Sequence, residues 1–347
     1  MSDLHQIDTR APGEQRWQVL GGVRFILASI VVCGHLVRFS PDSGIINHVV
    51  LRFGMLDPVA AVLGFLVISG FSIAHSIEQS PAGFYRRRII RLYPLYLVGL
   101  LMTVVVHALA GPNIKVLIGE FVQPNALTLG GNFLFLQGFL VHAVEANRPL
   151  WTLAVEVFCY ALAPLLAKCS QRCLIGLMVF SAGAFCVYPQ LHWEFYSRLI
   201  WGLPTIFLFW AWIGGFLLYR GNSRIRFALV LICISVLCVT VNRIALTPYA
   251  SLTLVTSIAA IALSDRIELG AFLGNISAYA GELSYPLYVV HVPVLILGYA
   301  VLGLRSSVVL VILAMTAAAV SYHVIDAPIR KFARRAMWMR RLFPSSG

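Results

Sequence analysis

Ten apolar stretches, each about long enough for a helix to cross a lipid bilayer, follow one another along this chain of 347 residues. Hydrophobic residues make up 59% of the chain and charged residues only 12%, whereas soluble domains carry about a quarter charged residues. One globular core cannot bury this excess, so lipid must be the solvent. The stretches cover approximately residues 19–39, 58–76, 92–111, 150–167, 174–190, 199–219, 227–242, 248–264, 285–303 and 307–325.

Backbone groups inside a bilayer are satisfied only in helices or closed barrels, and no stretch alternates like a barrel strand. We therefore predict an all-α integral membrane protein, a bundle of about ten transmembrane helices. A polar tail over 1–18 precedes the single transmembrane domain at 19–325, and a basic tail over 326–347 follows it at the membrane surface. No short apolar region with a small-residue cleavage site precedes the first stretch, so we expect no removed signal peptide.

Lysine and arginine residues orient the bundle. With the N-terminus inside, eighteen of the 26 fall on the inner side and seven on the outer side, while Arg24 lies within a stretch. This positive-inside bias predicts that both termini are cytoplasmic. The net charge of +12 reflects these short basic loops, so we expect no nucleic-acid partner.

One apolar segment, residues 126–141, is short and contains Asn132, Gln137 and three glycines. If it crossed the bilayer completely, the basic loops after it would change sides and the charge bias would collapse. We therefore interpret 112–149 as an outer segment with a re-entrant or surface-lying helix, tolerated where it is buried in protein or lines a cavity.

Ionisable residues inside the stretches are candidate functional groups, because each costs a few kcal/mol in lipid. Arg24 and His35 are eleven residues apart and so share one face of the first helix, about 16 Å apart along its axis. Glu156 lies in the outer half of its helix, at a depth within one or two turns of His35. This depth predicts a general-base pair in which Glu156 steadies the His35 imidazolium. Lipid snorkelling by Arg24, an interfacial His35 and a purely structural Glu156 pair are the alternatives.

The inner loop FYRRRIIRLYP is the strongest electrostatic feature. Arg87, Arg88 and Arg91 can present planar donors to phosphates, and Tyr93 can add a stacking ring; topology and anionic lipid contact are the alternative. His291 lies about six residues into its apolar stretch, so we place it in the inner half, away from the proposed chemistry, where it binds a cytoplasmic ligand or only satisfies a neighbouring helix. Most of the cysteines fall within apolar stretches, so we expect no disulfide framework and no metal.

Together these segments resemble the acyltransferase-3 family of membrane O-acyltransferases, and the resemblance covers most of the chain in order. Arg24 and His35 resemble the family's first-helix signature, and later segments resemble its other motifs. Two departures are visible, because Glu156 is followed by Val157 rather than a second acid and Asp326 stands where Glu is usual. The matching segments are FLVISGF, RRRIIRLYPLY, NFLFLQGF, LWTLAVEVFCYALAPLL, ELSYPLYVVHVPVL and IDAPIRKFARR.

The resemblance implies transfer of an acetyl or other short acyl group from cytoplasmic acetyl-CoA to a hydroxyl of a sugar, polysaccharide or glycolipid. It further implies that His35 and Glu156 are functional and that the arginine loop serves acyl-CoA. We expect the CoA arm to pass Arg24 toward His35, and Asn132 and Trp151 to line the acceptor side. The protein would then be a multi-pass protein of the plasma (inner) membrane in contact with lipids, and a homo-oligomer is compatible with the sequence. A transporter or flippase for an anionic or lipid-linked sugar is the main alternative, and a non-catalytic sensor or scaffold is a second.

Overall fold

The computed structural model describes residues 12–39, 44–191, 195–221, 223–242 and 249–342, and these residues are almost entirely helical. The helices and strands are α1 (Pro12–Leu36), α2 (Ile45–Gly54), α3 (Pro58–Gln79), α4 (Phe84–Ala110), β1 (Asn113–Lys115), β2 (Glu120–Val122), α5 (Ala126–Phe133), η1 (Glu145–Leu150), α6 (Trp151–Leu166), α7 (Gln171–Leu191), η2 (Tyr196–Arg198), α8 (Leu203–Arg220), α9 (Arg224–Val241), α10 (Ala250–Leu263), α11 (Ala271–Ile296), η3 (Leu297–Val301), α12 (Ser307–Ser321), η4 (Tyr322–Asp326) and α13 (Ala327–Leu342).

The prediction of an all-α polytopic membrane protein is confirmed. Within the described ranges, nine helices are long and apolar enough to cross a bilayer, and the predicted span at 248–264 forms the shorter helix α10. The tails are more helical than their composition suggested, since α1 already begins at Pro12 and α13 occupies Ala327–Leu342. The predicted tail residues 1–11 and 343–347 lie outside the described residues.

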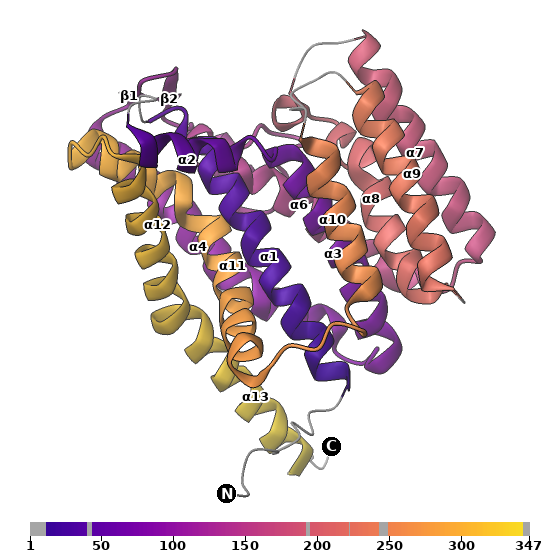
Figure 1. Cartoon of the computed structure of the whole chain (residues 1–347). Helices are drawn as coiled ribbons and strands as arrows, with labels where there is room; N and C mark the ends of the chain where they lie inside the picture. The colour runs from indigo at the N-terminus through magenta and orange to yellow at the C-terminus, as the bar shows by residue number, and fades with distance from the viewer. Residues whose placement is uncertain (1–11, 40–43, 192–194, 222, 243–248, 343–347) are drawn as a thin grey trace, which may run out of the picture.

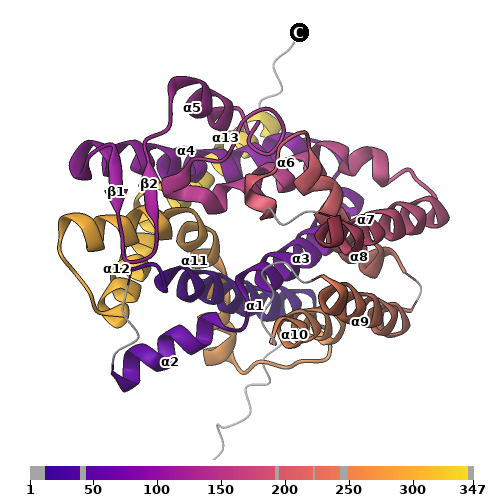
Figure 2. The same cartoon turned by 90° about the horizontal axis from the view of Figure 1, so that it is seen from above.

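The helices form one bundle with two distinguishable ends (Figure 1). At the basic end, α1 begins, α3 ends, α4 begins and α13 lies below the bundle. At the opposite end, called here the hairpin end, lie α2 and the antiparallel pair β1 and β2, in which Ile114 faces Phe121. Seen from above, α3 lies between α1 on one side and α8 on the other (Figure 2).

Small residues let α3 approach its neighbours closely. Gly70 on α3 faces α8, and Gly215 on α8 faces α3. A Cβ added at Gly70 would lie 1.9 Å from the Trp212 carbonyl oxygen, and a Cβ added at Gly215 would lie 1.9 Å from the Val67 carbonyl oxygen. Helices α1 and α11 meet in the same way at Gly21 and Gly281. Without a hydrophobic driving force between helices in lipid, such backbone proximity is a main source of packing energy.

The segment 126–141 contains no described helix long enough to cross a membrane, which agrees with its interpretation as a segment that does not span. Helix α5 has only eight residues, a length of about 12 Å. It leaves the hairpin end after β2, yet the Phe133 carbonyl accepts a hydrogen bond from Tyr93 in the first half of α4. The segment therefore dips into the bundle and returns, which is the re-entrant form of the expectation.

The contact between α3 and α8 predicts that Gly215→Ala destabilises the protein, because the new methyl group would displace backbone. We expect a loss of about 1–3 kcal/mol in the free energy of unfolding, measured from thermal unfolding in detergent. Gly176→Ala on α7 is the matched control, because nothing described lies within 4 Å of a Cβ at that position. Equal melting of the two variants would contradict the packing role of Gly215.

Candidate active site

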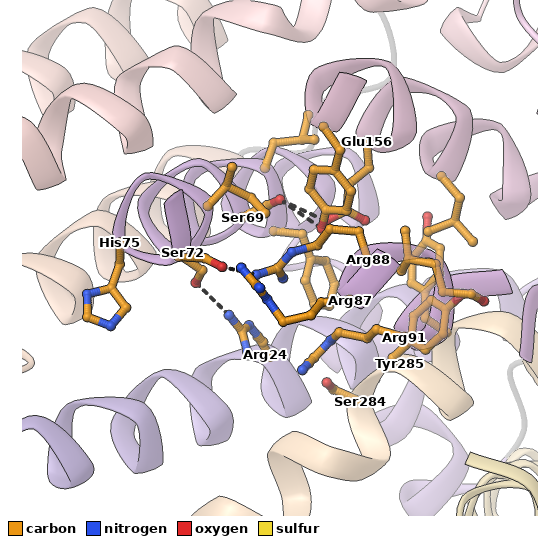
Figure 3. A pocket seen from close by; sticks show the side chains of 18 of the residues that line it. Arg24, Ser69, Ser72, His75, Arg87, Arg88, Arg91, Glu156, Ser284 and Tyr285 are labelled. Carbon is orange, nitrogen blue, oxygen red and sulfur yellow. Dashed lines mark hydrogen bonds between the residues drawn. The ribbon is translucent and has the colours of Figure 1, made fainter. Parts of the chain in front are cut away.

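A cavity of about 460 Å³ lies among α1, α3, α4, α6 and α11 (Figure 3). Along α3 its lining runs from Ser80, just beyond the helix, to Val62 in the second turn. Eighteen residues of helix rise about 27 Å, so the cavity follows nearly the whole length of α3. It begins at the basic end and extends toward the hairpin end as far as Val62, Phe65 and Tyr288.

Four arginines line this cavity, and three of them come from the first two turns of α4. The Arg24 guanidinium donates to Ser72 Oγ (2.8 Å), and that of Arg88 donates to Ser76 Oγ (2.6 Å). Arg91 makes no hydrogen bond within the described structure, and none of the four forms an ion pair with a described residue. Unpaired cations inside a protein are costly, so this cavity is suited to an anionic ligand. The four are Arg24, Arg87, Arg88 and Arg91.

The predicted arginine loop is in fact the beginning of a helix. Helix α4 starts at Phe84, after Gly83 in the left-handed conformation (φ 68°), rather than near residue 92 where the apolar stretch begins. Residues spaced three or four apart share a helix face, so Arg87, Arg88 and Arg91 are presented toward the cavity together. Tyr93 follows Arg91 by two residues and therefore points elsewhere.

Glu156 is the acidic member of the cavity lining. Its Oε1 accepts hydrogen bonds from Ser69 Oγ (2.7 Å) and from the Tyr160 hydroxyl. The expected contact between Glu156 and His35 is wrong, because no described interaction joins them. The two residues also lie at different depths. Glu156 binds Ser69, eleven residues along α3 from Pro58, whose ring packs against Gly34 beside His35, and eleven residues of helix rise about 16 Å.

His35 pairs with His291 instead. Their rings lie 5.2 Å apart between centroids, and His291 Nε2 lies 3.3 Å from His35 Nδ1. The expectation that His291 lies in the inner half, away from His35, is therefore wrong. Helix α11 begins at Ala271, fourteen residues before the apolar stretch used to estimate its depth, and His291 is correspondingly nearer the hairpin end.

The surroundings of the two imidazoles favour one neutral tautomer for each. His35 Nδ1 lies 2.8 Å from the Val31 carbonyl oxygen, and His291 Nδ1 lies 2.8 Å from that of Tyr288. A carbonyl oxygen only accepts, so both Nδ1 atoms carry the proton in this assignment. His35 Nε2 then holds a lone pair and meets no described hydrogen-bond partner. His291 is fully buried, whereas His35 is partly exposed, so His35 is the member of the pair able to act as a base.

The arginine cavity extends close to this histidine pair. Val62 is one turn from Pro58, whose ring packs against Gly34, the residue before His35. On α11, Tyr288 lines the cavity and lies 6.0 Å from the His291 ring between centroids. Its hydroxyl is fixed by Thr152 Oγ1 at 2.7 Å. About one helical turn thus separates the end of the cavity at Val62 from the level of His35.

Three other predicted site residues lie elsewhere. Tyr93 donates to the Phe133 carbonyl and packs against Phe135, so its ring is not a stacking surface in the arginine cavity. The buried Asn132 amide donates to the Thr128 and His142 carbonyls and therefore shapes the re-entrant segment. Trp151 is partly buried against the core at the start of α6; its contact with an acceptor stays a prediction.

The sequence interpretation missed the hydroxyl groups that hold the charged residues. Ser69, Ser72 and Ser76 are spaced three and four apart on α3, so they form a polar stripe on one face of an apolar helix. That spacing was a readable signal. Ser69 and Gly70 are adjacent but have different contacts, because Gly70 makes the close contact with α8 while Ser69 binds Glu156.

Comparison with known protein families agrees with this arrangement. The acyltransferase-3 family model, described as an acyltransferase domain, matches residues 18–324. The chain belongs to the acyltransferase-3 family. No match was found among curated proteins or among solved structures. The family assignment identifies the protein as a membrane acyltransferase, and both the arginine cavity and the histidine pair lie within the matched region.

Because the arginines form no ion pairs, we expect that removing one of them stabilises the ligand-free protein and weakens its binding of anions. Arg91→Gln should raise the melting temperature of the ligand-free protein, by about 0.5–2 kcal/mol of stability, because it removes like-charge repulsion. It should also reduce the stabilisation that pyrophosphate produces in wild type, measured by thermal shift. Arg172→Gln, on the exposed face of α7, should change neither quantity. A destabilised Arg91→Gln protein with unaltered response to pyrophosphate would contradict this interpretation.

Proposed function

We propose that this protein transfers an acetyl or other short acyl group from acyl-CoA to a hydroxyl of a sugar, on a polysaccharide or glycolipid, across the membrane. The observation that carries the proposal is the continuity of one cavity, from four arginines at the basic end to within about a turn of His35. With the basic end cytoplasmic, as the positive-inside bias predicts, donor and acceptor approach from opposite sides. The site would belong to a plasma (inner) membrane protein with both termini inside.

The arginine end of the cavity has the chemistry of a donor site. Guanidinium groups bind phosphate oxygens with several geometrically fixed donors, and the diphosphate of CoA would replace the ion pairs that the described arginines lack. The pantetheine arm is a flexible chain whose length is of the same order as the rise of about 16 Å from Arg24 to His35. Its thioester would then lie toward the hairpin end of the cavity, beside Tyr288 and Thr152.

The chemical step follows from the tautomer assigned to His35. Its Nε2 lone pair accepts the proton of the acceptor hydroxyl as that oxygen attacks the thioester carbonyl carbon. A C–O bond forms, the C–S bond breaks, and the CoA thiolate leaves and takes the proton from the His35 imidazolium, which returns the base to its neutral form. His291 lies beside the imidazolium that forms and fixes its orientation through the 3.3 Å contact.

Glu156 has a different part in this scheme from the one that the sequence predicted. It acts inside the donor cavity, where its carboxylate offsets part of the arginine charge and holds Ser69 and Tyr160 in place. It therefore positions the donor rather than the base. A general-base role for Glu156 through direct contact with His35 is not part of the proposal.

The sharpest test replaces the base while leaving the donor cavity intact. His35→Ala should lower acetyl transfer by about 10²–10⁴-fold, the usual contribution of a general base. Thermal stabilisation by CoA should persist, because His35 does not line the cavity. The matched control is His142→Ala, an exposed histidine near the same end, which should retain wild-type turnover.

The assay is designed to separate the enzyme from its rivals. Purified protein in lipid vesicles receives labelled acetyl-CoA on one side and candidate glycans on the other, and the label on glycan hydroxyls is measured. A transporter or flippase would move the glycan without acetyl-CoA and leave it unlabelled. A scaffold would give neither result, and full turnover by the His35→Ala variant would overturn the proposed mechanism.

A further inference from the structure

A second cavity, of about 310 Å³, lies on the other side of the arginine row. It shares Arg87, Arg88 and Arg91 with the donor cavity, so these side chains form a common wall between two hollows. Its other walls come from elements that the donor cavity does not touch, namely η4 and α13, and from Glu282 on α11. These residues are Tyr322, Ala327, Arg330 and Ala333.

Arg330 is the organising residue of this second cavity. Its Nη2 lies 2.5 Å from both Glu282 Oε2 and Asp326 Oδ2, and its guanidinium lies over the Tyr322 ring at 5.6 Å from the centroid. Its Nε is buried and has no partner in the described part of the chain. The pair of acids thus fixes the guanidinium in one place and leaves a donor uncommitted.

The charge of the cavity favours a second anionic group. Glu282 and Asp326 form ion pairs with Arg330 and also attract Arg91 at longer range. The four arginines that line the cavity still outnumber these two acids, and those of the common wall form no ion pair with a described residue. The Nε of Arg88 is also buried without a described partner. Beside these cations, the Tyr322 ring and two alanines provide a small apolar surface on which a planar base can pack.

We propose that this second cavity binds the 3′-phosphoadenosine end of the acyl-CoA donor. The inference rests on the proposed function. Coenzyme A carries two separate anionic groups on its adenosine: the 5′-diphosphate, which continues into pantetheine, and the 3′-phosphate. The diphosphate lies along the common wall of Arg87, Arg88 and Arg91, pantetheine extends into the donor cavity, and the 3′-phosphate faces Arg330. Adenine packs against Tyr322.

This arrangement explains why the arginines stand between two hollows rather than at the end of one. A site for pantetheine and diphosphate alone would need only the donor cavity. The second cavity adds recognition of the part of CoA that distinguishes it from its 3′-dephospho form. It also gives the last helix a role in donor selection, because α13 supplies Arg330.

The test compares CoA with 3′-dephospho-CoA on the full chain in nanodiscs of phosphatidylcholine. A hydrogen bond to a charged group contributes roughly ten- to a hundredfold in affinity, so wild type should bind CoA at least about tenfold more tightly than 3′-dephospho-CoA. Arg330→Gln should weaken the binding of CoA and so bring the ratio of the two Kd values toward one. Lys331→Gln makes the same charge change on the adjacent, exposed residue of α13 and should preserve the ratio. Adenosine 3′,5′-bisphosphate should compete with CoA in wild type and lose potency in Arg330→Gln.

Turnover separates the failure of this inference from failure of the proposed function. A wild-type protein that acetylates glycans from acetyl-CoA and from its 3′-dephospho form with equal KM would overturn the inference alone. Absence of acetyl transfer from any CoA donor would overturn the proposed function as well. Equal weakening of both ligands by Arg330→Gln would show that the residue only supports the common wall and would refute the 3′-phosphate contact.

One further outcome identifies a lipid headgroup as the occupant. In that case wild type would not discriminate between the two CoA forms. Phosphatidylglycerol added to the nanodiscs would instead raise the melting temperature, and Arg330→Gln would abolish that rise. This result also overturns the proposal.

Discussion

The arrangement of this protein depends on the cost of keeping unpaired guanidinium groups inside an apolar bundle. Four arginines face one cavity, and Glu156 is the single acid among its lining residues. Neighbouring serines satisfy part of their hydrogen-bonding capacity, but neutral hydroxyls do not neutralise charge. The fold therefore holds uncompensated positive charge at its basic end. An anionic ligand would neutralise this charge on binding and stabilise the protein.

Helix α3 connects these charged side chains to the rest of the bundle. One of its faces carries Gly70, which brings the backbone against α8, and another carries the serines that hold Arg24, Arg88 and Glu156. The helix is thus anchored on the side away from the cavity. A binding site needs a rigid helix behind its polar face, because motion of that helix would displace the hydrogen-bond donors that contact the ligand.

The sequence predicted the class of fold and most of the charged groups, but not their partners. Hydropathy located the nine described helices that are long and apolar enough to cross a bilayer, and the shorter α10, because lipid imposes length and composition on each span. It failed where polar residues continue a helix beyond its apolar part. Thus α4 begins before its apolar stretch, and α11 begins at Ala271 rather than near residue 285. Because the start of α11 was placed too late, the depth predicted for His291 was wrong and its neighbour His35 was missed.

The relative position of neighbouring helices was the second source of error. The sequence predicted one depth for Glu156 and His35, but packing places Glu156 beside Ser69 and Tyr160, eleven residues along α3 from Pro58 at the level of His35. The spacing rule did succeed within single helices. It placed Arg87, Arg88 and Arg91 on a common face, and the same rule applied to α3 would have revealed the serine stripe.

The apolar side chains of Val62 and Phe65, which line the cavity toward the hairpin end, have a consequence for the electrical integrity of the membrane. A continuous water-filled tunnel through this bundle would dissipate any ion gradient across the bilayer that holds it. Apolar side chains interrupt hydration, and the fixed positive charge of the four arginines at the basic end repels protons and metal cations. An acyl group attached to a carrier can be passed on at such an apolar segment, while the carrier and the ions on either side stay where they are.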